Sequence, residues 1–140
     1  MWFKLQPVKF LYIFLLFIVA NSLFAQLKTI THKTTYPFWI NVPEKESTEK
    51  QPILIFLHGK SLSGTDLNRV RRYGVLRAMD KGRKIPAIVV APQLAKGGWN
   101  PDKVLEVLEY VQKNYNTDST RVYVCGMSLG GYGTLHFAGK

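Results

Sequence analysis

An apolar, strand-like segment leads directly into a glycine-rich turn late in this chain of 140 residues. Val122–Cys125 is followed without a spacer by Gly126-Met-Ser128-Leu-Gly130. The Gly-x-Ser-x-Gly spacing is the sequence form of a nucleophile elbow, a tight strand-to-helix turn whose crowded backbone leaves room only for glycine around the serine. The segment therefore predicts a buried strand before Ser128 and a helix over Leu129–Ala138 after it.

Ser128 is the candidate nucleophile of this turn. A serine hydroxyl needs a base to accept its proton and N–H donors to hold the developing oxyanion, and a helix N-terminus offers such donors. At average residue frequencies, Gly-x-Ser-x-Gly occurs by chance in about one chain in twenty of this length. The flanking strand and helix therefore carry the prediction. A glycine-rich turn without chemistry is the alternative, and a dinucleotide-binding fingerprint fits less well because Ser128 replaces its second glycine.

The rest of the chain predicts an α/β fold. Two further continuous apolar runs, Ile53–Leu57 and Ala87–Ala91, are typical of parallel strands buried on both faces. Asn100 and Pro101 supply a capping side chain and a first-turn proline for a helix that follows. Strands that alternate with helices indicate a mostly parallel sheet with helices on both faces. We also expect strands within Leu27–Val42, short helical turns within Asp66–Met79, and a turn at Thr117–Thr120.

Several short motifs together resemble a known family. They are Leu57-His58-Gly59, Ala91-Pro92, Asp118-x-x-Arg121-Val-Tyr-Val and Gly126-Met-Ser-Leu-Gly-Gly-Tyr-Gly133. With them, residues 52–140 resemble the amino-terminal half of an α/β-hydrolase. The likeness is to the secreted esterase and peptidase branch with polyhydroxybutyrate-depolymerase-like, feruloyl-esterase-like and prolyl-oligopeptidase-like members.

This resemblance implies a serine hydrolase that cleaves carboxylic esters, or peptides, through an acyl-enzyme. Its substrates would be small esters, polysaccharide-linked esters or peptides, and the chemistry requires no metal and no cofactor. The implied roles are Ser128 as nucleophile, the backbone N–H groups of Leu129 and Lys60 as oxyanion hole, His58 and Gly59 as residues that orient this loop, and Gly126 and Gly130 as elbow glycines.

The chain departs from the family pattern after Ser128. The family order is serine, then an acid, then histidine, but no acid follows Ser128 and the only later histidine is His136. His136 lies eight positions along the predicted helix, roughly 12 Å away at 1.5 Å per residue, and His32 precedes the core. We therefore expect a fragment that lacks the triad acid and base and is nearly inactive alone, with Arg121–Cys125 left as an exposed sheet edge.

Two other classes of function stay open at this stage. One is a non-catalytic binding module that kept the same fold. The other is a basic, membrane-anchored protein in which the glycine-serine motif is accidental.

The first residues have the plan of a secretory signal peptide. Lys4 and Lys9 precede an unbroken apolar run, Phe10–Ala20, that is too short to span a bilayer comfortably. Cleavage after Ala25 would leave residues 26–140 as the amino-terminal part of a hydrolase domain, secreted or periplasmic. A retained membrane anchor is the alternative; otherwise we expect membrane contact only through this segment.

The net charge and the residues Cys125 and Trp99 say less about function than the motifs do. The formal net charge is +10, and seven basic residues fall within Arg69–Lys84, but no aromatic stacking pattern accompanies them and no nucleic-acid partner is predicted. Cys125 is the only cysteine; it excludes a disulfide within the chain, and we expect a small buried residue. Trp99, after Gly97-Gly98, could stack on a sugar or aromatic acyl group, or anchor its loop as a partly buried side chain.

Overall fold

The sheet has five strands in the order β1-β2-β4-β3-β5. This computed structural model describes residues 26–43 and 49–140, so the predicted signal peptide lies outside the described part. The pairs β4–β3 and β3–β5 are parallel, whereas β1–β2 and β2–β4 are antiparallel. The strands are β1 (Gln26–Ile30), β2 (Phe38–Val42), β3 (Gln51–Leu57), β4 (Ile88–Pro92) and β5 (Thr117–Gly126); the helices are η1 (Lys60–Leu62), η2 (Leu67–Arg72), α2 (Val75–Asp80), α3 (Pro101–Asn114) and α4 (Leu129–Ala138).

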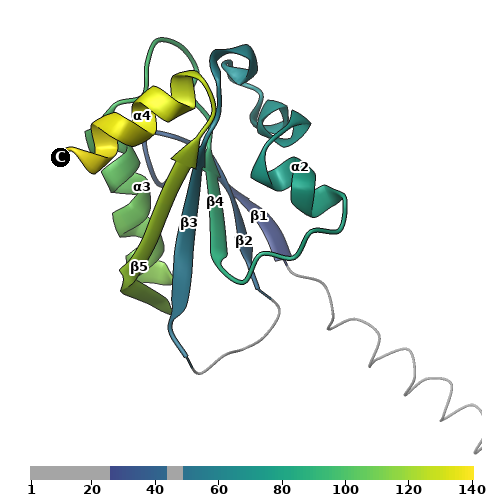
Figure 1. Cartoon of the computed structure of the whole chain (residues 1–140), viewed down its shortest axis with the longest axis vertical. Coiled ribbons are helices and arrows are strands. Elements are labelled where there is room, and N and C mark those ends of the chain that lie inside the picture. The colour runs from purple at the N-terminus through teal and green to yellow at the C-terminus, as the bar shows by residue number, and fades with distance from the viewer. Residues whose placement is uncertain (1–25, 44–48) are drawn as a thin grey trace, which may run out of the picture.

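Helices cover both faces of this sheet, as predicted. Figure 1 shows α3 and α4 on one face and η2 with α2 on the other. The central strand β4 contributes to both layers, because successive side chains of a strand point to opposite faces. Ile88 and Val90 join the cluster under α3, while Val89 and Ala91 join the smaller cluster under η2 and α2. β4 is buried along its whole length for this reason.

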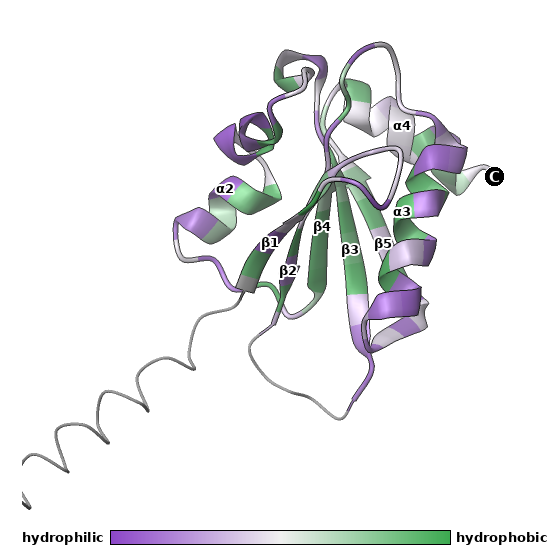
Figure 2. Cartoon of the chain, turned by 180° about the vertical axis from the view of Figure 1, so that it is seen from behind, coloured by the Kyte–Doolittle hydropathy of each residue, from purple (hydrophilic) through white to green (hydrophobic). Residues whose placement is uncertain are grey.

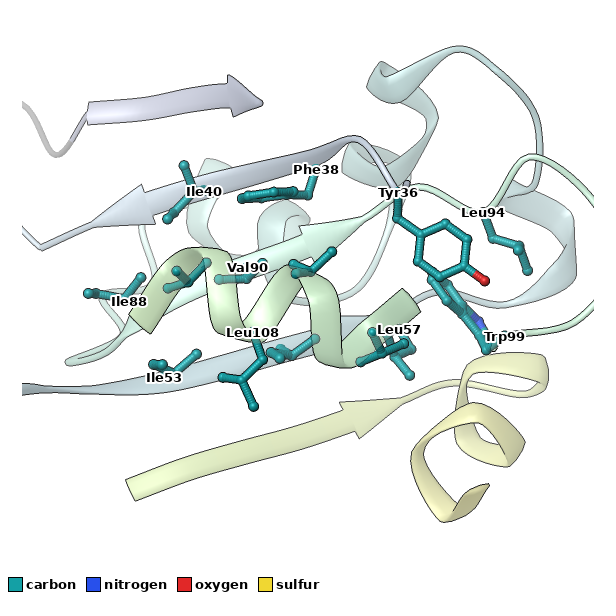
Figure 3. Packing of buried hydrophobic residues seen from close by; sticks show 14 residues of the cluster. Tyr36, Phe38, Ile40, Ile53, Leu57, Ile88, Val90, Leu94, Trp99 and Leu108 are labelled. Atoms are coloured by element: carbon teal, nitrogen blue, oxygen red, sulfur yellow. The ribbon is translucent and has the colours of Figure 1, made fainter. Parts of the chain in front are cut away.

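The larger core lies between the sheet and α3. Figure 3 shows Phe38, Ile40, Ile53, Val90 and Leu108 packed in this layer. In Figure 2 the strands β3 and β4 are mostly apolar, whereas α3 alternates polar and apolar patches around its axis. This amphipathic pattern orients α3 and buries one stripe of the helix against the sheet.

The local signals at helix α3 act as expected. The Asn100 side chain accepts hydrogen bonds from the N–H groups of Asp102 (2.9 Å) and Lys103 (3.3 Å). Pro101 occupies the first turn, where its missing N–H costs nothing. The predicted strands at Ile53–Leu57 and Ala87–Ala91 and the predicted helix at Leu129–Ala138 are also present, within one or two residues at each end.

Strand β5 corrects two predictions. Its apolar segment Val122–Cys125 was predicted to be buried, and Cys125 with it. Among the described strands β5 pairs only with β3, so Tyr123 is 57% exposed and Cys125 is exposed as well. The exposed sheet edge that was expected at Arg121–Cys125 is therefore present. The expected turn at Thr117–Thr120 lies inside the strand, where a register shift separates the pair Gln51–Thr117 from the pair Ile53–Val122. An apolar run therefore predicts that a strand forms, but it does not predict whether other elements bury both faces of that strand.

Within 26–43 and 49–140, no helix is both long enough and apolar enough to cross a bilayer.

Candidate active site

The turn between β5 and α4 holds Ser128 in an unusual backbone conformation. Its φ is 53° and its ψ is −118°, and among the described residues it is the one non-glycine residue with positive φ. Such a conformation costs about 1–3 kcal/mol and persists only where the surroundings enforce it. Ser128 is exposed at the tip of the turn, immediately before Leu129 begins α4.

Two glycines allow this turn to close. A β-carbon on Gly126 would lie 2.2 Å from the carbonyl oxygen of Gly130. A β-carbon on Gly130 would lie 1.8 Å from the carbonyl oxygen of Leu57, at the end of β3. Both obstacles are backbone atoms, which cannot rotate away as a side chain would. Gly131 is different, because a β-carbon there would meet only the Gly126 oxygen, at 3.8 Å.

The loop that follows β3 lies against the same turn. Met127 donates its N–H to the Leu57 carbonyl oxygen over 3.2 Å. A β-carbon on Gly59 would lie 3.1 Å from the Met127 carbonyl oxygen and 3.5 Å from Cβ of Ser128. The carboxyl ends of β3 and β5 therefore bring the loop at Gly59 and the serine together.

Two backbone N–H groups begin helices at this edge of the sheet. Lys60 is the first residue of η1 and Leu129 is the first residue of α4. First-turn N–H groups have no acceptor within their own helix. In the part of the chain that the structure describes, no turn or loop hydrogen bond uses either group. Both donors are thus available to a bound anion or a carbonyl oxygen.

Comparison with solved structures identifies the fold that carries this arrangement. No protein-family model matches the sequence, and no curated protein sequence does. Solved structures do match. A thermostable esterase is 27% identical with a TM-score of 0.58, and the match covers 77% of this chain and 36% of that enzyme. A CE1 ferulic acid esterase from the anaerobic fungus Anaeromyces mucronatus is 16% identical with a TM-score of 0.53, and the match covers 82% of this chain and 53% of that enzyme. An acylaminoacyl peptidase is 18% identical with a TM-score of 0.54, and the match covers 84% of this chain and 22% of that enzyme.

The chain has the α/β-hydrolase fold. It spans about a third of the thermostable esterase and about half of the ferulic acid esterase. The resemblance and the fold class predicted from the motifs are confirmed by these matches.

His58 is a buried, neutral part of the loop that follows β3. Its Nε2 accepts a hydrogen bond from the N–H of Leu94 (3.0 Å), so the ring proton resides on Nδ1 and is donated to the carbonyl oxygen of Gly59 (2.8 Å). Burial lowers the pKa of His58 from its usual 6.5; the bond to Gly59 opposes this shift and the positive charge of Arg69 adds to it. Both ring nitrogens are occupied, and the side chain is fully buried.

Gln93, which the sequence reasoning missed, directly follows β4 and hydrogen-bonds the loop that follows β3. Its Nε2 donates to the carbonyl oxygens of Leu62 (2.9 Å) and Gly64 (2.7 Å). Gly64 returns a hydrogen bond from its N–H to the Leu94 carbonyl oxygen (3.1 Å). A signal existed, because Gln93 is polar and directly follows the buried strand β4, where a polar side chain must find partners.

Trp99 is an anchor and not an exposed stacking surface. It is 6% exposed, and its Nε1 donates to the His58 carbonyl oxygen over 3.1 Å. Its ring meets those of His58 and Tyr36 edge to face, and a β-carbon on Gly133 of α4 would lie 2.7 Å from the Trp99 Cβ. Figure 3 shows Trp99 beside Tyr36 and Leu57 at this end of the core. Of the two interpretations of Trp99, the buried anchor is therefore confirmed.

The other charged and titratable residues of the motifs lie away from Ser128. Asp118 accepts hydrogen bonds from Thr120 and Arg121, which lower its pKa to about 2. Arg121 donates to the Lys50 carbonyl oxygen (2.6 Å) and so ties the beginning of β5 to the segment before β3. His136 is exposed on α4, and His32 follows β1 at the opposite edge of the sheet.

A paired glycine substitution tests the turn. We expect Gly130→Ala to lower the free energy of unfolding by about 3 kcal/mol or more, because the new methyl group meets the Leu57 carbonyl. Gly131→Ala is the matched control: it has room and lies in a helix, so it should be neutral or stabilising by up to about 1 kcal/mol. Urea denaturation of both variants measures the difference, and equal losses at the two positions would contradict the contact.

The buried imidazole predicts a dependence of stability on pH. Because folding lowers the pKa of His58 below 6.5, its contribution to stability is complete above pH 6.5. It declines as the pH falls below that value towards the lowered pKa, by at most about 1.4 kcal/mol per pH unit for one proton. Denaturation between pH 7.5 and 5.5 should show this loss in the parent and in His136→Gln but not in His58→Gln. A loss of the same size in His58→Gln would assign it to other groups.

Proposed function

We propose that this chain carries the nucleophile and oxyanion site of a serine hydrolase that cleaves carboxylic esters through an acyl-enzyme at Ser128. The observation that carries the proposal is the exposed serine held at positive φ between β5 and α4. Such strain is retained where it presents a reacting group. The matches to esterases of the same fold support hydrolysis as the reaction.

In the proposed reaction, the Ser128 Oγ bonds to the ester carbonyl carbon while a base accepts the hydroxyl proton. The N–H groups of Leu129 and Lys60 hydrogen-bond the oxygen that becomes negatively charged. The carbon–oxygen bond to the alcohol then breaks, and the alcohol leaves with the proton that the base held. Water attacks the acyl-enzyme by the same steps and releases the acid. Gly59 permits the close approach of this loop, and His58 orients it through its bonds to Leu94 and Gly59.

We propose that the base and the acid of this reaction follow Lys140 in the full gene product. His58 has both nitrogens engaged in the protein interior, and His136 lies exposed along α4. No acidic residue follows Ser128 in the sequence. We therefore propose that this chain is the amino-terminal part of a longer enzyme, with the triad acid and histidine after Lys140, and that the 140 residues alone are nearly inactive.

The proposed substrate class is a carboxylic ester, whether small or attached to a polysaccharide. The matched ferulic acid esterase supports this class, and the acylaminoacyl peptidase makes peptides the second candidate. Both reactions pass through an acyl-enzyme and need the same donors.

The first and last residues of the native protein test both the cleavage of a signal peptide and the proposed extension past Lys140. We expect the mature protein to begin at Gln26, after removal of a signal peptide that directs it to the periplasm or the exterior. We also expect it to extend past Lys140 and to supply an acid followed by a histidine. Peptide mapping of the secreted protein by mass spectrometry measures both ends. A product that retains residues 1–25 would contradict export by a cleaved signal, and a product that ends at Lys140 would contradict the triad proposal.

Active-site labelling tests the nucleophile. A fluorophosphonate probe should label the full gene product at Ser128, because it phosphonylates an activated serine hydroxyl. Ser128→Ala should abolish labelling, whereas the exposed Ser119→Ala should leave it unchanged. The 140-residue chain by itself should react at least about 1,000-fold more slowly, because removal of a triad base has an effect of this order or larger. A full-length product labelled elsewhere, or not at all, would refute the proposal.

A further inference from the structure

Tyr73 brings a phenol hydroxyl to the space beside Ser128. A β-carbon on Gly59 would lie 3.0 Å from the Tyr73 hydroxyl oxygen. The same point lies 3.5 Å from Cβ of Ser128. The hydroxyl and the serine therefore both adjoin Gly59, within the reach of one small acyl group.

The backbone around Tyr73 explains this position. Tyr73 ends η2 in an extended conformation, with φ −154° and ψ 178°. Gly74 follows with φ 82°, and a β-carbon on it would lie 2.2 Å from the ring of Phe56 in β3. Only glycine permits this close approach, so the chain passes tightly over the end of β3 and carries the tyrosine ring towards the serine turn.

A neighbouring serine orients the phenol. The Tyr73 hydroxyl lies 2.8 Å from the Ser61 Oγ, and either group could donate. Ser61 directly follows Lys60, whose N–H is one of the two proposed oxyanion donors. When the Ser61 hydroxyl donates, the Tyr73 proton is free to point at a third oxygen. Tyr73 is half-buried and Ser61 is exposed, so this pair borders solvent, where substrate would enter.

We infer that Tyr73 contacts the substrate, with its hydroxyl donating a hydrogen bond to an oxygen of the reacting ester group. Ser61 holds the phenol oxygen and leaves the phenol proton for this bond. The inference rests on the proposed role of Ser128. It adds a side-chain donor to the two backbone N–H groups, in a region where the sequence pattern marks no catalytic tyrosine.

The competing explanation is that Tyr73 only tethers the loop through Ser61. The two explanations differ in which variant is worse. Tyr73→Phe removes the donor and the tether but keeps the ring, whereas Ser61→Ala removes the tether and keeps the phenol. A tether alone predicts equal losses in the two variants. A substrate donor predicts a larger loss for Tyr73→Phe.

The experiment uses the full gene product with p-nitrophenyl acetate and the fluorophosphonate probe. We expect Tyr73→Phe to lower kcat/KM and the labelling rate by about 100-fold or more, mainly through kcat, since loss of one oxyanion donor costs about 100- to 1,000-fold in kcat. Ser61→Ala should lose about threefold or less. Tyr123→Phe, an exposed tyrosine on β5, is the matched control and should keep the parental rate. Thermal unfolding of each variant reports whether it folds normally.

The outcomes separate the two proposals. A parent protein that the probe does not label refutes the function of Ser128 and, with it, the role of Tyr73. A labelled parent with Tyr73→Phe within twofold of its rate refutes the role of Tyr73 alone. Equal losses in Tyr73→Phe and Ser61→Ala, accompanied by equal drops in Tm, would assign Tyr73 to the tether.

Discussion

The arrangement at the carboxyl edge of the sheet depends on one backbone contact, between Gly130 and the Leu57 carbonyl. That carbonyl also accepts the Met127 N–H, so the end of β3 meets the serine turn on both sides of Ser128. The turn closes because Gly130, the second residue of α4, carries no β-carbon where it crosses the end of β3. Ser128 takes a strained conformation that the surrounding backbone enforces, and no side-chain contact has to hold it there.

Support for this edge comes from the interior. His58, Gln93 and Trp99 are buried polar or amphipathic side chains whose bonds run between the loop after β3 and the loop after β4. Trp99 also packs beneath Gly133, so α4 rests on the same tryptophan that holds the His58 carbonyl. Two loops and one helix therefore form a connected unit, since moving one of them would break the hydrogen bonds that His58, Gln93 and Trp99 make to its neighbours.

The sequence predicted the strands, the helix cap at Asn100 and the serine turn, because these are local patterns of apolar period, capping and glycine spacing. The cover of each strand is not local: Val122–Cys125 and Ile53–Leu57 are alike as apolar runs, but one lies at the edge and the other inside. Tyr73 and Gln93 were missed because their roles depend on which loops meet across the sheet. The proposed nucleophile and oxyanion donors could be named from motifs, whereas their spatial relation required the fold.

The order of the strands along the chain has a consequence for biosynthesis. β3 and β4, which bury the core, are made before β5 and α4, and the parallel partner of β5 is already in place when β5 emerges. A growing chain can therefore assemble the serine turn early, in the vectorial order of translation. In the described sheet β5 pairs on one side only, with β3, so its other edge and the exposed Tyr123 beside it are open to pairing with a strand of another chain.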